Sequence, residues 1–221
     1  IGTSFRRVMR NKDVVFYDTE TTGLDPWRRG TWEVAAIRDT VDGESLRYQA
    51  QIPLTNYSLQ YLEPKAAEIT HFHDRYLNTV DYPVKDPWVV RSELWEFFKD
   101  AHVIGMCPDF DIWNLHFLQN ASEDYPREPI SWYYQLIDVD NVAAGVFMAK
   151  GFHVNLPFNT TAACKFLGVE RDEKLKHSAM YDVEMTRDYW YRLLAFASNT
   201  KNWTDYEDIH KTLLTEREKK D

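Results

Sequence analysis

Residues 14–23, with the sequence Val14-Val15-Phe16-Tyr17-Asp18-Thr19-Glu20-Thr21-Thr22-Gly23, join an apolar run to two carboxylates and a glycine. The apolar run predicts a buried strand, and residues two apart on a strand face the same way. Asp18 and Glu20 would therefore repel each other, by roughly 4 kcal/mol at 4 Å and an effective dielectric near 20. A multivalent cation is the usual reason to hold such a pair together. The stretch thus indicates a metal site at a strand end, and a solvated strand end is the alternative.

A histidine and an aspartate far along the chain extend this acidic set. His177 stands five residues before Asp182, at the start of a long predicted helix. In an ideal helix that spacing would turn the two side chains about 140° apart. They can share a site only if His177 lies in the loop before the helix, a boundary that the cap candidate Ser178 also favours.

A third acidic segment lies between these two. Residues 103–111 predict a short buried strand that passes into a helix with Pro108 in its first turn. Asp109 and Asp111 then lie near a helix N-terminus, which stabilises negative charge by about 0.3 to 1 kcal/mol. Helix capping is the alternative role for both. We favour Asp111 as the site carboxylate, with Asp109 as an acid that either assists or replaces it.

The three segments together resemble the motifs of the DEDDh-type 3′ to 5′ exonucleases, a DnaQ-like family. The matching residues follow the family's order and approximate spacing: Asp18-x-Glu20-x-Thr22-Gly23-Leu24, Phe110-Asp111 followed by Phe117-Leu118, and His177-x-Ala179-x-x-Asp182. Ser178 stands where the tyrosine subgroup would have Tyr. The resemblance runs from about residue 13 to 195. It departs at Met106-Cys107, where the family usually has His-Asn.

The resemblance implies a metal-dependent hydrolase with a defined set of site residues. Asp18, Glu20, Asp111 and Asp182 would bind two Mg²⁺ or Mn²⁺ ions, hard cations that prefer oxygen ligands. His177 would take a proton from the attacking water. The implied substrate contacts are Thr21, Thr22, Gly23, Leu24 and Phe110, with Leu24 wedged against the terminal bases. An ordinary core position is the alternative for Leu24.

The expected fold is α/β, a ribonuclease-H-like fold with a central mixed five-stranded sheet flanked by helices. Strands are predicted at 13–18, 31–40, 44–52 and 132–139, and helices at 86–100 and 141–150. The last core helix should bury a stripe made of Val183, Thr186, Trp190, Leu193 and Ala197. We expect residues 1–197 to form the exonuclease domain and residues 198–221 a helical extension of it.

Composition limits the ways in which this chain can hold nucleic acid. Its formal net charge is −9, whereas proteins that grip long nucleic acid usually present a basic face. Metals, base stacking and local cationic patches would have to suffice. Candidate cations near the first motif are Arg6, Arg7, Arg10, Lys12, Arg28 and Arg29, and candidate stacking residues are Trp27, Trp32 and Tyr57.

The two cysteines and the hydropathy of the chain indicate its compartment. Cys107 and Cys164 lie in segments predicted to be buried and lack zinc-type partners, so we expect reduced core thiols. No stretch of 18 apolar residues and no secretory leader is visible. We therefore expect a cytoplasmic protein with no membrane partner.

These features predict an exonuclease that releases nucleoside 5′-monophosphates from the 3′ end, with single-stranded DNA slightly favoured over RNA. The partner would be the 3′ end of a nucleic acid, and either a homodimer or a polymerase or replication partner is left open. One alternative is a catalytically inactive exonuclease-like scaffold or polymerase accessory subunit. Another is a different metal-dependent phosphoryl-transfer enzyme on the same fold.

Overall fold

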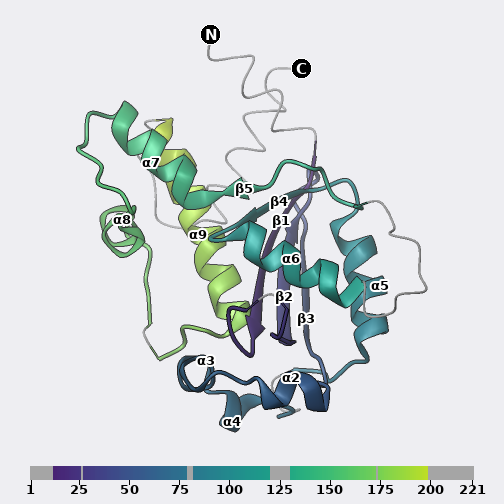
Figure 1. The fold of residues 1–221 in the computed structure, drawn as a ribbon. Coiled ribbons are helices and arrows are strands. Elements are labelled where there is room, and N and C mark those ends of the chain that lie inside the picture. Colours follow the sequence, from purple (N-terminus) through teal and green to yellow (C-terminus); the bar gives the residue numbers. More distant parts are fainter. Residues whose placement is uncertain (1–11, 26, 79–81, 120–129, 173, 199–221) are drawn as a thin grey trace.

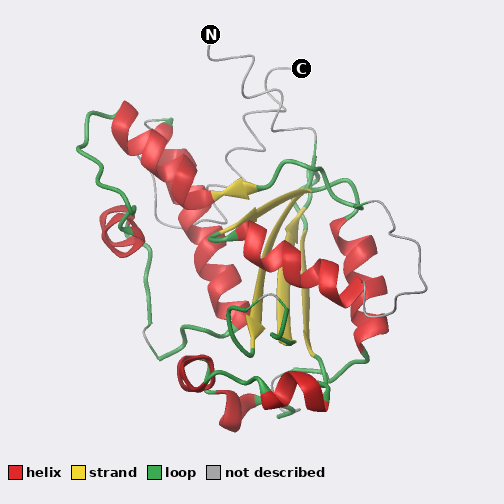
Figure 2. Ribbon diagram, in the orientation of Figure 1, coloured by secondary structure: helices red, strands yellow, loops and turns green. Residues whose placement is uncertain are grey.

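The computed structural model describes residues 12–25, 27–78, 82–119, 130–172 and 174–198. Its centre is a five-stranded sheet in the order β3-β2-β1-β4-β5, whose layers are drawn in Figures 1 and 2. The strands are β1 (Val14–Thr21), β2 (Thr31–Asp39), β3 (Ser45–Gln51), β4 (His102–Gly105) and β5 (Ile137–Asp138). The β1–β2 and β2–β3 pairs are antiparallel, and the β1–β4 and β4–β5 pairs are parallel. The predicted mixed five-stranded sheet is confirmed.

Helices cover both faces of this sheet and the end of β1. The described helices are α2 (Asn56–Gln60), α3 (Pro64–Ile69), α4 (Phe72–Arg75), α5 (Pro87–Phe98), α6 (Pro108–Gln119), α7 (Val139–Ala149), α8 (Thr160–Leu167) and α9 (Ala179–Ala197). In Figure 1, α7, α8 and α9 lie on one side of the sheet, and α5 and α6 on the other. The short helices α2, α3 and α4 lie beyond the end of β1, at the bottom of the view.

The alternation of side chains along β1 creates two hydrophobic cores. Phe16 points toward α7 and α9 and packs in a core with Val183 and Leu193. Val15 and Tyr17 face the other way, into a core that α5 and α6 complete. Because apolar side chains cover both faces, β1 is the central strand of the molecule, and its last residues are fixed from both sides.

The predicted elements agree with the structure except in two places. The strand predicted at 132–139 is wrong, because only Ile137–Asp138 is a strand. Upstream of it, Tyr133 N instead donates to Ala101 O at 2.9 Å, and Trp132 is buried against Phe98 as an irregular segment. The buried stripe of α9 is wrong at Ala197, which is exposed, whereas Ala195 is buried.

Several sequence predictions fall outside the described residues. They are the helical extension beyond residue 198 and the cations Arg6, Arg7 and Arg10. Within the described residues, no helix is long and apolar enough to cross a membrane.

A buried ion pair joins α9 to the sheet and gives a test of the packing. Arg187 Nε and Nη2 donate to the carboxylate of Asp39 at 2.7 and 2.8 Å, and Tyr191 Oη donates to the same carboxylate at 2.7 Å. The Arg187→Leu variant leaves this carboxylate buried without its cation, so we expect a loss of about 3–5 kcal/mol in the free energy of unfolding, measured in urea. Lys65→Ala, which removes an exposed pair with Glu68, is the control and should cost no more than about 1 kcal/mol. A loss for Arg187→Leu as small as that of the control would contradict this view of the packing.

Candidate active site

The end of β1 supplies the first two carboxylates of the candidate site. Asp18 is partly buried and Glu20 is buried, and their spacing places both on the face of the sheet that α9 covers. The turn after β1 is closed by hydrogen bonds between Thr22 and Gly30, from Thr22 N to Gly30 O at 3.0 Å and from Gly30 N to Thr22 Oγ1 at 2.8 Å. The strand end is therefore a fixed platform for the two acids.

Helix α6 brings Asp111 to the same strand end. Its carboxylate is buried and accepts hydrogen bonds from Thr19 N at 3.0 Å and Thr19 Oγ1 at 2.7 Å. Asn114 Nδ2 in turn donates to Thr19 Oγ1 at 2.8 Å. Asp109 is exposed one half-turn away and shares none of these bonds in the described residues. The geometry therefore places Asp111 among the site carboxylates and Asp109 at its outer rim.

Asn114 is a residue that the sequence analysis missed. Asn114 lies one helical turn after Asp111 and binds the Thr19 hydroxyl, which in turn donates to the Asp111 carboxylate. Its sequence position could have indicated this role, because residues three apart on a helix, such as Asp111 and Asn114, lie on the same face. Cys107 itself is exposed, so its predicted burial is wrong, whereas Cys164 is buried as predicted.

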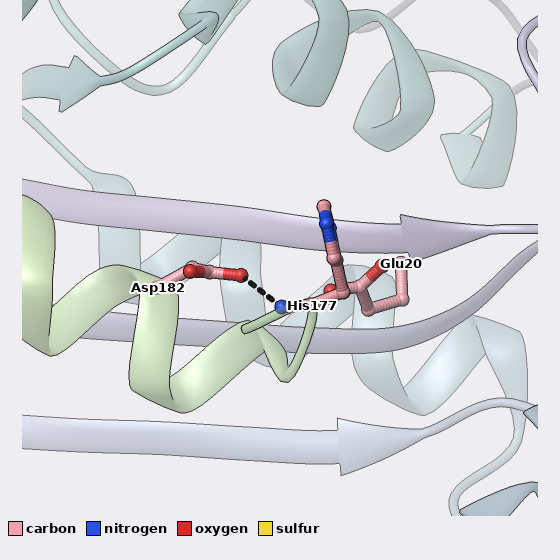
Figure 3. A group of neighbouring side chains, drawn as sticks. All are labelled: Glu20, His177 and Asp182. Atoms are coloured by element: carbon pink, nitrogen blue, oxygen red, sulfur yellow. Dashed lines mark hydrogen bonds between the residues drawn. The ribbon is translucent and has the colours of Figure 1, made fainter. Parts of the chain in front are cut away.

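His177 and Asp182 approach from the start of α9, as Figure 3 shows. Because α9 begins at Ala179, His177 lies in the preceding loop as predicted, with a left-handed φ of 58°. Its backbone N–H donates to Asp182 Oδ2 at 2.8 Å. One ligand atom from each of Glu20, His177 and Asp182 lies within 4.8 Å of the others. The loop therefore turns the imidazole toward the carboxylates.

An ion pair from elsewhere in the fold holds the His177 loop. Arg75, at the end of α4, donates to His177 O at 2.6 Å and also to both carboxylate oxygens of Glu33 on β2. Glu33 is fully buried and accepts from Ala179 N at 2.8 Å. The pair thus binds the backbone on both sides of Ser178. Glu33 matches a glutamate that is usual in the second strand of the family that the sequence resembles, but its pairing with Arg75 was not predicted, because Arg75 lies in a linker with few regular patterns.

Burial raises the pKa of all four site carboxyl groups. The pKa of Asp111 rises to about 7, although two hydrogen bonds from Thr19 oppose the effect of burial. The pKa of Asp182 rises to about 6, opposed by the N–H of His177. For Asp18 and Glu20 the pKa rises well above the ordinary range, first through burial and then through neighbouring negative charges. Without cations, the fully ionised site is therefore unfavourable.

The predicted substrate loop, Thr21 to Leu24, shows two kinds of residue. Thr21 and Thr22 are buried, and their hydroxyl groups bind backbone atoms of the same turn. Gly23 lies against the Glu63 carboxylate, which also accepts from Leu24 N at 3.1 Å. The Leu24 side chain is 73% exposed, so the alternative of a core position is wrong.

The predicted cationic and aromatic residues divide by exposure. Arg29 lies over the ring of Phe110, 4.1 Å from its centroid, and Arg28 lies over the ring of Tyr61. Trp27 and Tyr57 are exposed, whereas Trp32 is fully buried against Phe72 and cannot stack on a substrate.

The donor atoms at this site suit a hard divalent cation. Carboxylates from β1, α6 and α9 gather at one point, and repulsion between them is the largest unfavourable interaction there after burial. Oxygen ligands are those that Mg²⁺ and Mn²⁺ prefer. The residues present therefore fit the two ions that the sequence analysis expects.

Comparisons with known proteins bear on the family and the fold of the chain. The RNase T model, which describes an exonuclease family, matches residues 15–188. No curated protein sequence matches the chain.

Solved structures of E. coli Exonuclease I share the fold. Its complex with a dT13 oligonucleotide is 18% identical, with a TM-score of 0.61, over 86% of this chain and 41% of that chain. The zinc-bound form of its complex with ssDNA is 18% identical, with a TM-score of 0.59, over 93% and 43% of the two chains. A complex of ExoI with SSB-Ct is 16% identical, with a TM-score of 0.59, over 93% and 44%. This chain thus spans less than half of those proteins, and the likeness confirms the ribonuclease-H-like fold.

The raised pKa values give a stability test with a defined sign. Asp111 and Asp182 bind protons more tightly in the folded than in the unfolded chain. The protonated groups therefore stabilise the fold fully below about pH 4, and this stabilisation is lost as pH rises through about 6–7. Asp18→Asn removes one of the repelling charges. In EDTA, we expect this variant to melt several degrees above the unchanged protein at pH 8, with a smaller difference at pH 5. Glu96→Gln, which changes an exposed acid far from the site, is the control. If Asp18→Asn and the unchanged protein melt at the same temperature at pH 8, the proposed repulsion is contradicted.

Proposed function

The chain belongs to the RNase T exonuclease family, whose model spans most of its length, and on that premise we propose that it is a metal-dependent 3′ to 5′ exonuclease. It hydrolyses phosphodiester bonds at the 3′ end of nucleic acid and releases nucleoside 5′-monophosphates. The observation that carries this proposal is the convergence of Asp18, Glu20, Asp111 and Asp182 with His177 at the end of β1.

The carboxylates and the imidazole divide the chemistry between them. Asp18, Glu20, Asp111 and Asp182 would hold two Mg²⁺ or Mn²⁺ ions, and such ions would supply charge stabilisation to the attacking and leaving oxygens. His177 accepts the proton of the attacking water at a ring nitrogen. Its loop position, exposed yet directed to Glu20 and Asp182, supports this role.

The loop after β1 supports binding of the terminal nucleotide. Leu24 offers an exposed apolar side chain beside the carboxylates, suited to a wedge against a base. Thr21 and Thr22 contribute through the shape of the turn, because their hydroxyl groups are already bound to backbone. Phe110 lies next to Asp111 with Arg29 over its ring, so it can line the same end of the site.

We favour single-stranded DNA over RNA as the substrate. Structures with the same fold hold single-stranded DNA, among them Exonuclease I with dT13. The net charge of −9 also favours a short single-stranded grip over contacts with a long duplex. A homodimer, a polymerase or replication partner and a cytoplasmic location stay predictions. For the partner, the complex of ExoI with SSB-Ct is a parallel.

The catalytic assignment is tested with DNA and RNA oligonucleotides of one sequence, labelled at the 5′ end. We expect a ladder that shortens from the 3′ end with Mg²⁺ or Mn²⁺ and is absent in EDTA. Asp18→Asn, Asp111→Asn and His177→Ala should each lower the rate by about 100-fold or more, because each removes a ligand or the base. Asp109→Asn should be far less damaging than Asp111→Asn.

Matched controls separate chemistry from folding. Asp42→Asn changes an exposed acid in the β2–β3 turn and should keep the rate within about twofold, and circular dichroism should be unchanged in every variant. Full activity in Asp18→Asn or His177→Ala would refute the assignment, and a ladder that shortens from the 5′ end would refute the polarity.

Arg75 gives a second test, of a residue that acts through the His177 loop. Arg75→Met removes the donor to His177 O and leaves Glu33 without its cation. The double variant Arg75→Met with Glu33→Gln removes the buried charge as well. We expect the double variant to recover part of the stability lost in Arg75→Met. Its kcat should stay about 10-fold low or lower, with KM little changed. Recovery of kcat together with stability would show that the ion pair has only a structural role.

A further inference from the structure

A groove lined with aromatic residues opens beside the candidate active site. It lies between α6 and the irregular segment before β5, and its described lining includes Arg29, Phe110, Trp113, Ile130 and Tyr134. The groove borders the site through Arg29, which lines the groove and whose charge acts on the Asp111 carboxylate. A strand of nucleic acid whose 3′ end lies at the carboxylates therefore has this surface within reach.

Arg29 stands at the junction of the groove and the site. Its guanidinium lies over the Phe110 ring and donates to Leu24 O at 3.0 Å. Its charge acts on the Asp111 carboxylate. Buried Nε of Arg29 has no hydrogen-bond partner within the described part of the chain. Arg29 therefore places a positive charge where the groove meets the carboxylates, and that charge favours a phosphate there.

The walls of the groove expose large flat side chains. Trp113 is 46% exposed and Tyr134 is 68% exposed, and Trp132 is buried beneath them. Exposed apolar surface that gathers in one place is typical of a binding site, and bases stack on aromatic rings without regard to sequence. Asp109 also lines the groove, and its negative charge favours bases over phosphates at that point.

We propose that this groove binds the bases of the nucleotides that precede the 3′-terminal one in a single strand, with Trp113 and Tyr134 as stacking surfaces. This rests on the proposed function and adds to it a reason for preferring unpaired strands. Bases in a duplex are already stacked and paired, so they cannot lie flat on these two rings without unpairing. Stacking also supplies the affinity that a chain of net charge −9 lacks for phosphates.

The test compares a long substrate with a minimal one. The long substrate is a single-stranded DNA of about 12 nucleotides, and the minimal one is the p-nitrophenyl ester of thymidine 5′-monophosphate, which has no preceding nucleotide. Trp113→Ala and Tyr134→Ala should each lower kcat/KM on the DNA by about 10-fold and leave the ester rate within about twofold. Phe166→Ala is the matched control, because Phe166 is 54% exposed on α8, across the sheet from the groove.

Each outcome decides the question. Loss on the DNA alone, in the groove variants and not in Phe166→Ala, supports the proposal. Equal loss on both substrates, or no loss on either, overturns it while leaving the proposed function intact. An unchanged protein that hydrolyses neither substrate overturns the proposed function, and this inference with it.

Discussion

Repulsion among four carboxyl groups at the end of β1 is the constraint on which the rest of the structure depends. Asp18 and Glu20 come from the strand, Asp111 from α6 and Asp182 from α9, so both helical layers must meet the sheet at one point. Burial raises the pKa of each group, and neighbouring negative charges add to the effect at Asp18, Glu20 and Asp111. A fold stable enough to hold such a cluster must fix its backbone from several sides, and divalent cations are the natural means of balancing the charge.

The surroundings hold the site through backbone atoms and neutral donors. Thr19 and Asn114 fix Asp111 without adding a charge beside it. Arg75 pairs with Glu33 and donates to one backbone carbonyl of the loop, that of His177. None of the hydrogen bonds described above joins a cation to a site carboxylate, and the imidazole is directed by a loop that is itself anchored.

Local patterns predicted the parts of this structure that local geometry determines. The spacing of Asp18 and Glu20 on a strand, and the angle that excludes His177 from the helix of Asp182, follow from backbone periodicity alone. Predictions that needed tertiary contacts failed or were not made. The sequence around Trp32 does not distinguish a buried from an exposed ring. In the structure Trp32 is buried against Phe72 of α4, a helix 40 residues further along the chain. The segment 132–139 has strand composition, but before β5 one hydrogen bond, from Tyr133 N to Ala101 O, and the packing of Trp132 on Phe98 take the place of a ladder. Arg75 acts across 102 residues, a distance at which no spacing rule applies.

The most direct test of the central claim is to count the metal ions that the carboxylates bind. Isothermal titration of Mn²⁺ at pH 7.5, with a nucleoside 5′-monophosphate present, measures both stoichiometry and affinity. We expect two ions per chain, and a loss of at least one of them in Asp182→Asn with the fold retained. No Mn²⁺ binding, or binding that Asp182→Asn leaves unchanged, would contradict the assignment of this cluster as a two-metal site.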